Sequence, residues 1–69
     1  MKNSLYGFSY TFRIFRGGSL VKEFKEQKNE SEAFRWMCHN TPATVSKALR
    51  DGWRVEQENE QTKKVELWR

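Results

Sequence analysis

The chain has few of the residues that usually carry chemistry or crosslink a fold. It holds one cysteine, one histidine and one proline among 69 residues. A single cysteine cannot form an internal disulfide, so nothing points to an oxidising compartment. No apolar run is long enough to span a bilayer or to act as a secretory signal. We therefore expect a soluble, cytoplasmic protein that has no membrane partner.

Catalytic and metal-binding groups are equally scarce. Cys38 and His39 are neighbours in a predicted helix, so their side chains diverge and are poorly placed as a nucleophile and its base. Two adjacent ligands cannot close a metal site. Gly17-Gly18 lies between two predicted strands and does not lead into a helix, as a phosphate-binding loop would. The sequence predicts a protein that is not an enzyme and that uses neither metal nor cofactor.

Aromatic and charged residues, in contrast, are plentiful, at 14% and 32% of the chain. Sixty-nine residues lie near the lower limit for one hydrophobic core, and large aromatic side chains can supply such a core. We expect a single small domain over residues 1–69. The net charge of +4 comes from residues 1–28, which hold six Lys or Arg and two Glu. A local excess of this kind favours an anionic partner.

Alternation of aromatic and polar residues over residues 5–16 predicts a half-buried strand. One face of this strand would carry the side chains of Tyr6, Phe8, Tyr10, Phe12 and Ile14. The double glycine Gly17-Gly18 supplies the positive φ values that a tight turn needs, and a second strand follows to about Glu26. These features predict an N-terminal β-hairpin.

The register of this hairpin is predicted from the pairing that keeps apolar residues on one face. A two-residue turn would set apolar residues opposite charged ones, so we expect a three-residue loop, Gly17-Gly18-Ser19. That loop sets Phe12 opposite Phe24, Arg13 opposite Glu23, Phe15 opposite Val21 and Arg16 opposite Leu20.

Two short helices are predicted in the middle of the chain. Asn29 suits the cap of the first, with Glu32 placed to reach back to it. The apolar stripe of this helix comprises Ala33, Phe34 and Met37, with Trp36 or Cys38 at its edge. Thr41 and Pro42 suit the cap and first residue of the second helix, and Gly52 suits the left-handed residue after it. Its stripe comprises Val45, Ala48 and Leu49.

Residues 53–69 predict a second hairpin. A loop at Asn59-Glu60-Gln61 sets Val55 opposite Val65 and Trp53 opposite Leu67, and it pairs opposite charges on the other face. The complete order is β-β-α-α-β-β. We therefore predict an α+β fold with a mainly antiparallel sheet and two short helices packed on one face.

The strongest candidate for a binding surface is an apolar centre with a charged rim, formed by Arg13, Phe15, Val21 and Trp68. This composition is typical of protein interfaces, in which Arg and Trp are frequent hot spots. We expect a non-enzymatic binding module, a small accessory or inhibitor protein of the kind that phages and mobile elements encode. It would act sterically by binding a protein or protein complex. The alternative is that this surface belongs to an ordinary solvated hairpin and has no binding function.

Two further alternatives stay open. The basic N-terminal hairpin suits a nucleic-acid-binding module that follows a phosphate backbone through Arg13, Arg16, Lys22, Lys25 and Lys28. An unpaired outer strand also suits a homodimer in which two copies join across a two-fold axis.

Overall fold

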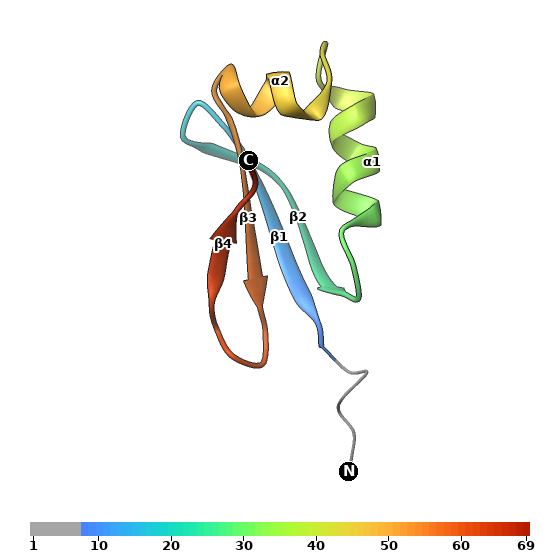
Figure 1. Ribbon diagram of the computed structural model, residues 1–69, viewed down its shortest axis with the longest axis vertical. Helices are drawn as coiled ribbons and strands as arrows, with labels where there is room; N and C mark the ends of the chain where they lie inside the picture. Colours follow the sequence, from blue (N-terminus) through green and yellow to red (C-terminus); the bar gives the residue numbers. More distant parts are fainter. Residues whose placement is uncertain (1–7) are drawn as a thin grey trace.

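The computed structural model describes residues 8–69, and its elements follow one another in the predicted order (Figure 1). Strands β1 (Tyr10–Arg16) and β2 (Ser19–Gln27) are followed by helices α1 (Ser31–Asn40) and α2 (Val45–Arg50), and then by strands β3 (Trp53–Asn59) and β4 (Val65–Leu67). The α+β fold class is confirmed. The part of the predicted first strand before residue 8, including Tyr6, lies outside the described residues.

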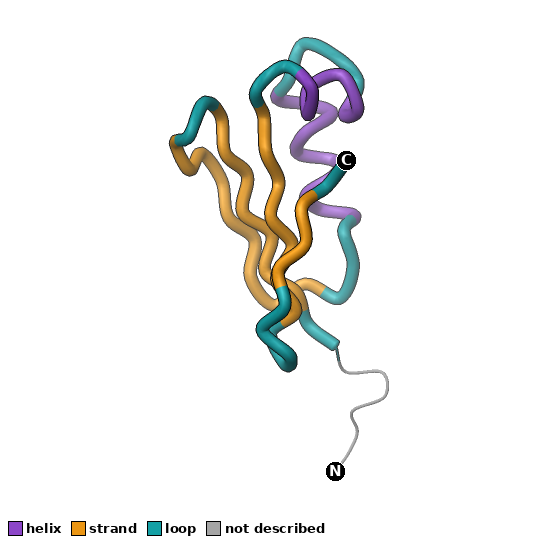
Figure 2. Tube along the Cα trace, turned by 60° about the vertical axis from the view of Figure 1, so that its left-hand side comes forward, coloured by secondary structure: helices purple, strands orange, loops and turns teal. Residues whose placement is uncertain are grey.

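The four strands form one antiparallel sheet in the order β2-β1-β3-β4. Both helices lie on the same side of this sheet, α1 along its length and α2 across one end (Figures 1 and 2). We name this side the helix face and the opposite side the open face. Because side chains alternate along a strand, the register of each residue decides the face to which it belongs.

The hydrophobic core lies between the helix face and the two helices. Its buried residues are Phe12, Ile14, Ala33, Met37, Ala48 and Val55. Trp36 joins them at the edge of α1, where its ring meets that of Trp53 edge-on at 6.2 Å. Full burial of a large apolar side chain contributes about 1.5–3 kcal/mol. The core is therefore the main source of stability in this small domain.

The first hairpin turns through two residues, so the predicted three-residue loop is wrong. Arg16 pairs with Ser19 across Gly17-Gly18 and not with Leu20. The two glycines have φ values of 57° and 88°, a conformation that residues with a Cβ atom adopt reluctantly.

A β-bulge reconciles this short turn with the predicted faces. Phe15 pairs with Leu20, whereas Phe12 pairs with Phe24 as predicted, so Val21 is one extra residue between the two pairs. Both Leu20 and Val21 therefore lie opposite Phe15 on the open face. Burial against the helices favours the pairing of Phe12, and the bulge absorbs the difference in length.

Helix α1 begins one residue later than predicted. Its N-cap is Glu30, which makes no side-chain capping hydrogen bond. The Asn29 side chain instead accepts a hydrogen bond from the Ser31 amide at 2.9 Å and shapes the turn before the helix. Glu32 does not reach back either, since it lies 3.8 Å from Arg35 on the exposed side of α1.

Helix α2 begins three residues later than predicted because a different threonine caps it. The Thr44 hydroxyl accepts a hydrogen bond from the Lys47 amide at 3.2 Å. Thr41 instead closes α1, where its hydroxyl donates to the carbonyl oxygen of Met37 at 2.9 Å. The sequence offers two threonines of equal capping ability, and the end of α1 decides between them. Gly52 follows α2 with a φ of 109°, as predicted.

The second hairpin is shifted by three residues from the predicted register. Val65 pairs with Glu58 and not with Val55, and Leu67 pairs with Glu56. A shift by an odd number of residues exchanges the two faces of a strand. Val65 and Leu67 therefore lie on the open face, although the predicted register set them opposite Val55 and Trp53.

Hydrogen bonds within the loop account for this register. The Asn59 side chain accepts from two loop amides at 2.9 and 3.1 Å, and the Asn59 amide donates to the Lys64 carbonyl oxygen at 2.9 Å. The loop therefore comprises residues 60–63, of which Lys63 has a left-handed φ of 67°. The predicted register rested on pairs of opposite charges across the two strands, and such pairs do not depend on the hydrogen bonds of the turn.

Candidate protein-binding surfaces

The open face has a charged band between two apolar margins. The band lies mainly on β1 and β3 and includes Arg13, Glu23, Glu56 and Glu58. One margin is formed by Leu20 and Val21 of β2 and the other by Val65 and Leu67 of β4, with these side chains between 43% and 53% exposed. Figure 2 shows that neither helix reaches this side of the sheet.

Arg13 lies in the middle of the charged band and contacts three glutamates. Its Nε atom donates to Glu23 at 3.1 Å and its Nη2 atom to Glu58 at 2.8 Å, while Glu56 lies 3.8 Å from Nη1. The hydrogen bond to Glu58 is the main reason that the pKa of Arg13 is raised above its ordinary value. The guanidinium is thus neutralised and oriented by its own chain.

Phe15 lies under a second arginine near the turn end of the open face. The Arg54 guanidinium is 4.3 Å from the centroid of the Phe15 ring, in a cation–π contact. The same guanidinium lies 3.5 Å from Glu56, which connects it to the charged band. Together with Leu20 and Val21, these groups form a small apolar patch with a charged rim.

A side-chain clamp closes the other end of the open face. The Glu60 carboxylate accepts hydrogen bonds from the Thr11 hydroxyl at 2.6 Å and from the Glu26 amide at 3.0 Å. These two bonds, that from Thr11 above all, lower the pKa of Glu60. Glu26 has a φ of 58°, which is uncommon for a residue other than glycine. The loop after β3 thereby fastens an irregular part of β2.

The structure brings three of the four predicted protein-binding residues together on the open face: Arg13, Phe15 and Val21. Trp68 lies on the helix face because of the shifted register of β4. Its amide donates to the Val55 carbonyl oxygen at 3.0 Å, and its indole Nε1 donates to the Gln57 side chain at 3.0 Å. The structure therefore separates Trp68 from the other three residues.

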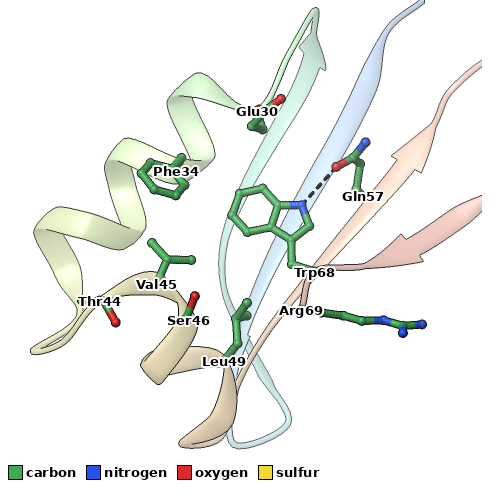
Figure 3. A pocket seen from close by; sticks show the side chains of 9 residues that line it. All are labelled: Glu30, Phe34, Thr44, Val45, Ser46, Leu49, Gln57, Trp68 and Arg69. Atoms are coloured by element: carbon green, nitrogen blue, oxygen red, sulfur yellow. Dashed lines mark hydrogen bonds between the residues drawn. The ribbon is translucent and has the colours of Figure 1, made fainter.

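Trp68 borders a groove that the sequence analysis missed (Figure 3). The groove has a volume of about 530 Å³ and lies between α1, α2 and the β4 end of the sheet. Its apolar wall is formed by Phe34, Val45, Leu49 and Trp68. Phe34 belongs to the predicted apolar stripe of α1, yet its side chain is 47% exposed. The groove exists because α2 crosses the end of the sheet. The apolar periodicity of a helix predicts which of its faces is buried but not the angle at which it crosses a sheet.

Two basic residues of the first hairpin lie against aromatic rings. The Arg16 guanidinium is 5.5 Å from the centroid of the Trp53 ring, and the Lys22 ammonium is 5.2 Å from that of Phe24. Both contacts are cation–π interactions within the chain, so each cation already has an intramolecular partner.

The basic residues predicted to follow a phosphate backbone do not share one face. Lys22 pairs with Ile14 and belongs to the helix face, whereas Arg13 lies on the open face. Lys25 and Lys28 lie toward the end of β2 that is far from the Gly17-Gly18 turn. The five positions are thus spread over both faces and both ends of the hairpin.

Cys38 and His39 lie in the last turn of α1, and both are exposed. Within residues 8–69, no three side chains among His, Cys, Asp and Glu come close enough together to hold a metal ion. Neither α1 nor α2 is long and apolar enough to cross a membrane.

Comparison of the chain with protein-family models, with curated proteins and with solved structures finds no match. The function is therefore argued from the surfaces described above.

Proposed function

We propose that this chain is a non-enzymatic module that binds a protein partner through the open face of its sheet. The observation that carries the proposal is the distribution of exposed apolar residues. Within residues 8–69, four of the six exposed large hydrophobic side chains lie on this face, which neither helix covers: Leu20, Val21, Val65 and Leu67. Apolar surface gathered in this way is typical of interaction sites.

The charge of the open face favours a protein over a nucleic acid. A phosphate-binding surface needs cations that are free to displace counterions. Arg13, which would lie at the centre of such a surface, is occupied by carboxylates at 2.8 and 3.1 Å. A nucleic acid on this face would also meet Glu23, Glu56 and Glu58.

The proposed mechanism is steric, as expected of a small accessory or inhibitor protein. The charged band and the Glu60 clamp hold the face in one arrangement before a partner arrives. Preorganisation of this kind lowers the entropy lost on binding. The module would occupy a surface of a protein or protein complex, with Val21 and Phe15 as apolar anchors and the charged band setting the orientation.

Photo-crosslinking from the open face tests this proposal. A photoreactive amino acid replaces Val21, and in a matched control it replaces Cys38, which is exposed on α1. Irradiation in cells of the source organism is expected to join one protein to position 21 and not to position 38. Equal crosslinking from both positions would contradict the proposal.

The captured partner is then purified and titrated with the wild type, Val21→Asp and Cys38→Asp. Loss of a hot spot worth about 2 kcal/mol corresponds to an increase in Kd of about 30-fold. We expect that increase for Val21→Asp and an unchanged Kd for Cys38→Asp. An unchanged Kd for both variants would place the interface elsewhere.

Titration with fluorescent duplex and single-stranded DNA and RNA tests the alternative function, a nucleic-acid-binding module. At about 50 mM salt we expect no binding tighter than about 10⁻⁴ M. Tighter binding that weakens at about 200 mM salt and in Arg16→Ala or Lys25→Ala would support the nucleic-acid-binding module instead.

A further inference from the structure

The two edges of the sheet differ in how readily they accept another strand. The β2 edge is nine residues long, but two register shifts interrupt it. It also carries Lys22, Lys25 and the left-handed Glu26. Bulges and lysines are features that keep edge strands from pairing. The β4 edge pairs regularly with β3 and carries Val65 and Leu67, which are 51% and 53% exposed.

The hydrogen bonds between β3 and β4 leave part of the β4 backbone free. The Trp68 amide donates to β3 at 3.0 Å, and the Lys64 carbonyl oxygen accepts from β3 at 2.9 Å. In an antiparallel ladder, alternate residues bond to the same neighbour, so Glu66 also faces β3. The N–H and C=O groups of Val65 and Leu67 therefore point outward, away from the sheet.

The charges along the β4 edge indicate which segment would complement it. Glu66 lies in the middle of β4, Lys64 directly precedes the strand, and Arg69 is the second residue after it. None of these three side chains forms an ion pair within residues 8–69. An added antiparallel strand sets one residue directly opposite each of them. The complementary segment is therefore acidic at both ends and basic in the middle, with apolar residues between.

A second copy of the chain fits this edge poorly. Full overlap of two β4 strands, with Val65 opposite Leu67, sets Glu66 opposite its own symmetry mate, and like charges directly opposed are destabilising. A register centred on Val65 sets Leu67 opposite Lys63, whose φ of 67° is not that of a strand. A register centred on Leu67 sets charged residues opposite apolar ones, with Glu66 facing Trp68.

We propose that the free edge of β4 binds an extended segment of a partner protein as a fifth, antiparallel strand. Backbone hydrogen bonds to Val65 and Leu67 supply affinity, and alternate side chains supply specificity. The segment has six residues, of which the first lies opposite Arg69 and the last opposite Lys64. In this order its residues are acidic, aromatic, β-branched, basic, β-branched and acidic. This proposal rests on the proposed function only in that the ligand is a protein. It uses the backbone edge of β4, whereas the proposed function uses the side chains of the open face, to which Val65 and Leu67 also contribute.

A capped hexapeptide, EFVKVE, is the probe for this edge. We expect the Val65 and Leu67 amides of the free protein to exchange rapidly with solvent and the Glu66 and Trp68 amides to be protected. Saturating peptide should slow exchange at Val65 and Leu67 about tenfold or more. The same peptide N-methylated at both valines is the control, because it cannot donate to β4. Equal effects of the two peptides would overturn the proposal.

A charge exchange at the central pair tests the register. The wild type is expected to bind EFVKVE about tenfold more tightly than EFVEVE, because one cross-strand pair changes from attraction to repulsion. Glu66→Lys, at an exposed position, should reverse this preference. The same preference in both proteins would overturn the proposal, as would chemical-shift changes confined to the groove residues Phe34 and Leu49.

Three further outcomes distinguish peptide binding at the β4 edge from dimerisation and from binding at the open face. Dimerisation in sedimentation velocity, with Val65 and Leu67 amides already protected in the protein alone, would assign the edge to a second copy. Crosslinking from position 21 that persists when no peptide binds β4 would overturn this proposal alone. Peptide binding without crosslinking from position 21 would instead overturn the proposed function alone.

Discussion

Replacement of Arg13 by methionine is expected to lower the free energy of unfolding by about 2 kcal/mol. Arg13 makes two charged hydrogen bonds, at 3.1 Å to Glu23 and at 2.8 Å to Glu58. Such bonds contribute about 1.5–3 kcal/mol when buried, and exposed ion pairs about 0.2–1 kcal/mol. The side chains of Arg13, Glu23 and Glu58 are 20–31% exposed, so solvent screens these bonds in part. We therefore assign each bond a contribution of about 1 kcal/mol to the free energy of unfolding. A domain of this size has a total stability of about 3–10 kcal/mol, so the loss is measurable.

The effect of the Arg13→Met substitution should depend on salt. Without the guanidinium, Glu23, Glu56 and Glu58 face one another, and Arg54, which lies 3.5 Å from Glu56, offsets their charge only in part. The Debye length falls from about 10 Å at 0.1 M to about 3 Å at 1 M salt, so high salt screens their repulsion. We expect about half of the lost stability to return at about 1 M NaCl.

A double-mutant cycle in urea, followed by tryptophan fluorescence, measures the pair directly. Glu58→Gln should cost about 1 kcal/mol in the wild type and nothing in the Arg13→Met background, where it removes a like charge. Arg35→Met is the matched control, since Arg35 is 65% exposed and lies 3.8 Å from Glu32. Its effect should stay within about 0.5 kcal/mol. Equal costs for Glu58→Gln in both backgrounds would refute this reasoning.

Three further substitutions test other parts of the fold. Glu60→Gln should lower stability near neutral pH and lose its effect as the pH falls, because a carboxylate with a lowered pKa stabilises the fold only while it is ionised. Urea midpoints measured across the acidic range check this, and a constant difference from the wild type would contradict it. Glu26→Gly should raise stability by about 0.5–1 kcal/mol because it relieves a φ of 58°, whereas Glu26→Ala keeps the strain and serves as control. Met37→Ala should lower stability by about 3 kcal/mol through a cavity in the core, and Met37→Leu by less than about 1.5 kcal/mol. Equal losses for the two Met37 variants would refute the cavity explanation.

The elements and their order could be predicted because they depend on local physics. Alternating side chains specify a strand, two consecutive glycines specify a tight turn, and apolar residues at helical spacing specify α1 and α2. The pairing of Arg13 with Glu23 also followed from the sequence, because Phe12 and Phe24 hold that part of the hairpin in register. The two remaining contacts of Arg13, with Glu56 and Glu58, come from β3, so they could be predicted only from the order of the strands in the sheet.

The candidate sites were predicted less completely, for an equally physical reason. The position of Trp68 depends on the β4 register, and a loop stabilised by the Asn59 side chain and the left-handed Lys63 decides that register. Apolar and charge patterns within each strand are compatible with several registers. The choice among them is made by turn hydrogen bonds and by the packing of Trp68 against Phe12 and Phe34.

The sequence by itself determined the strands, the helices, their order and the apolar residues that form the core. Only the tertiary structure decided which residues became surface features. It neutralised Arg13 with glutamates from two neighbouring strands and turned Val65 and Leu67 to the open face. It also left a groove beside Trp68 where α2 crosses the end of the sheet. Local propensities act over a few residues, whereas strand register and helix crossing depend on contacts between segments far apart in the chain.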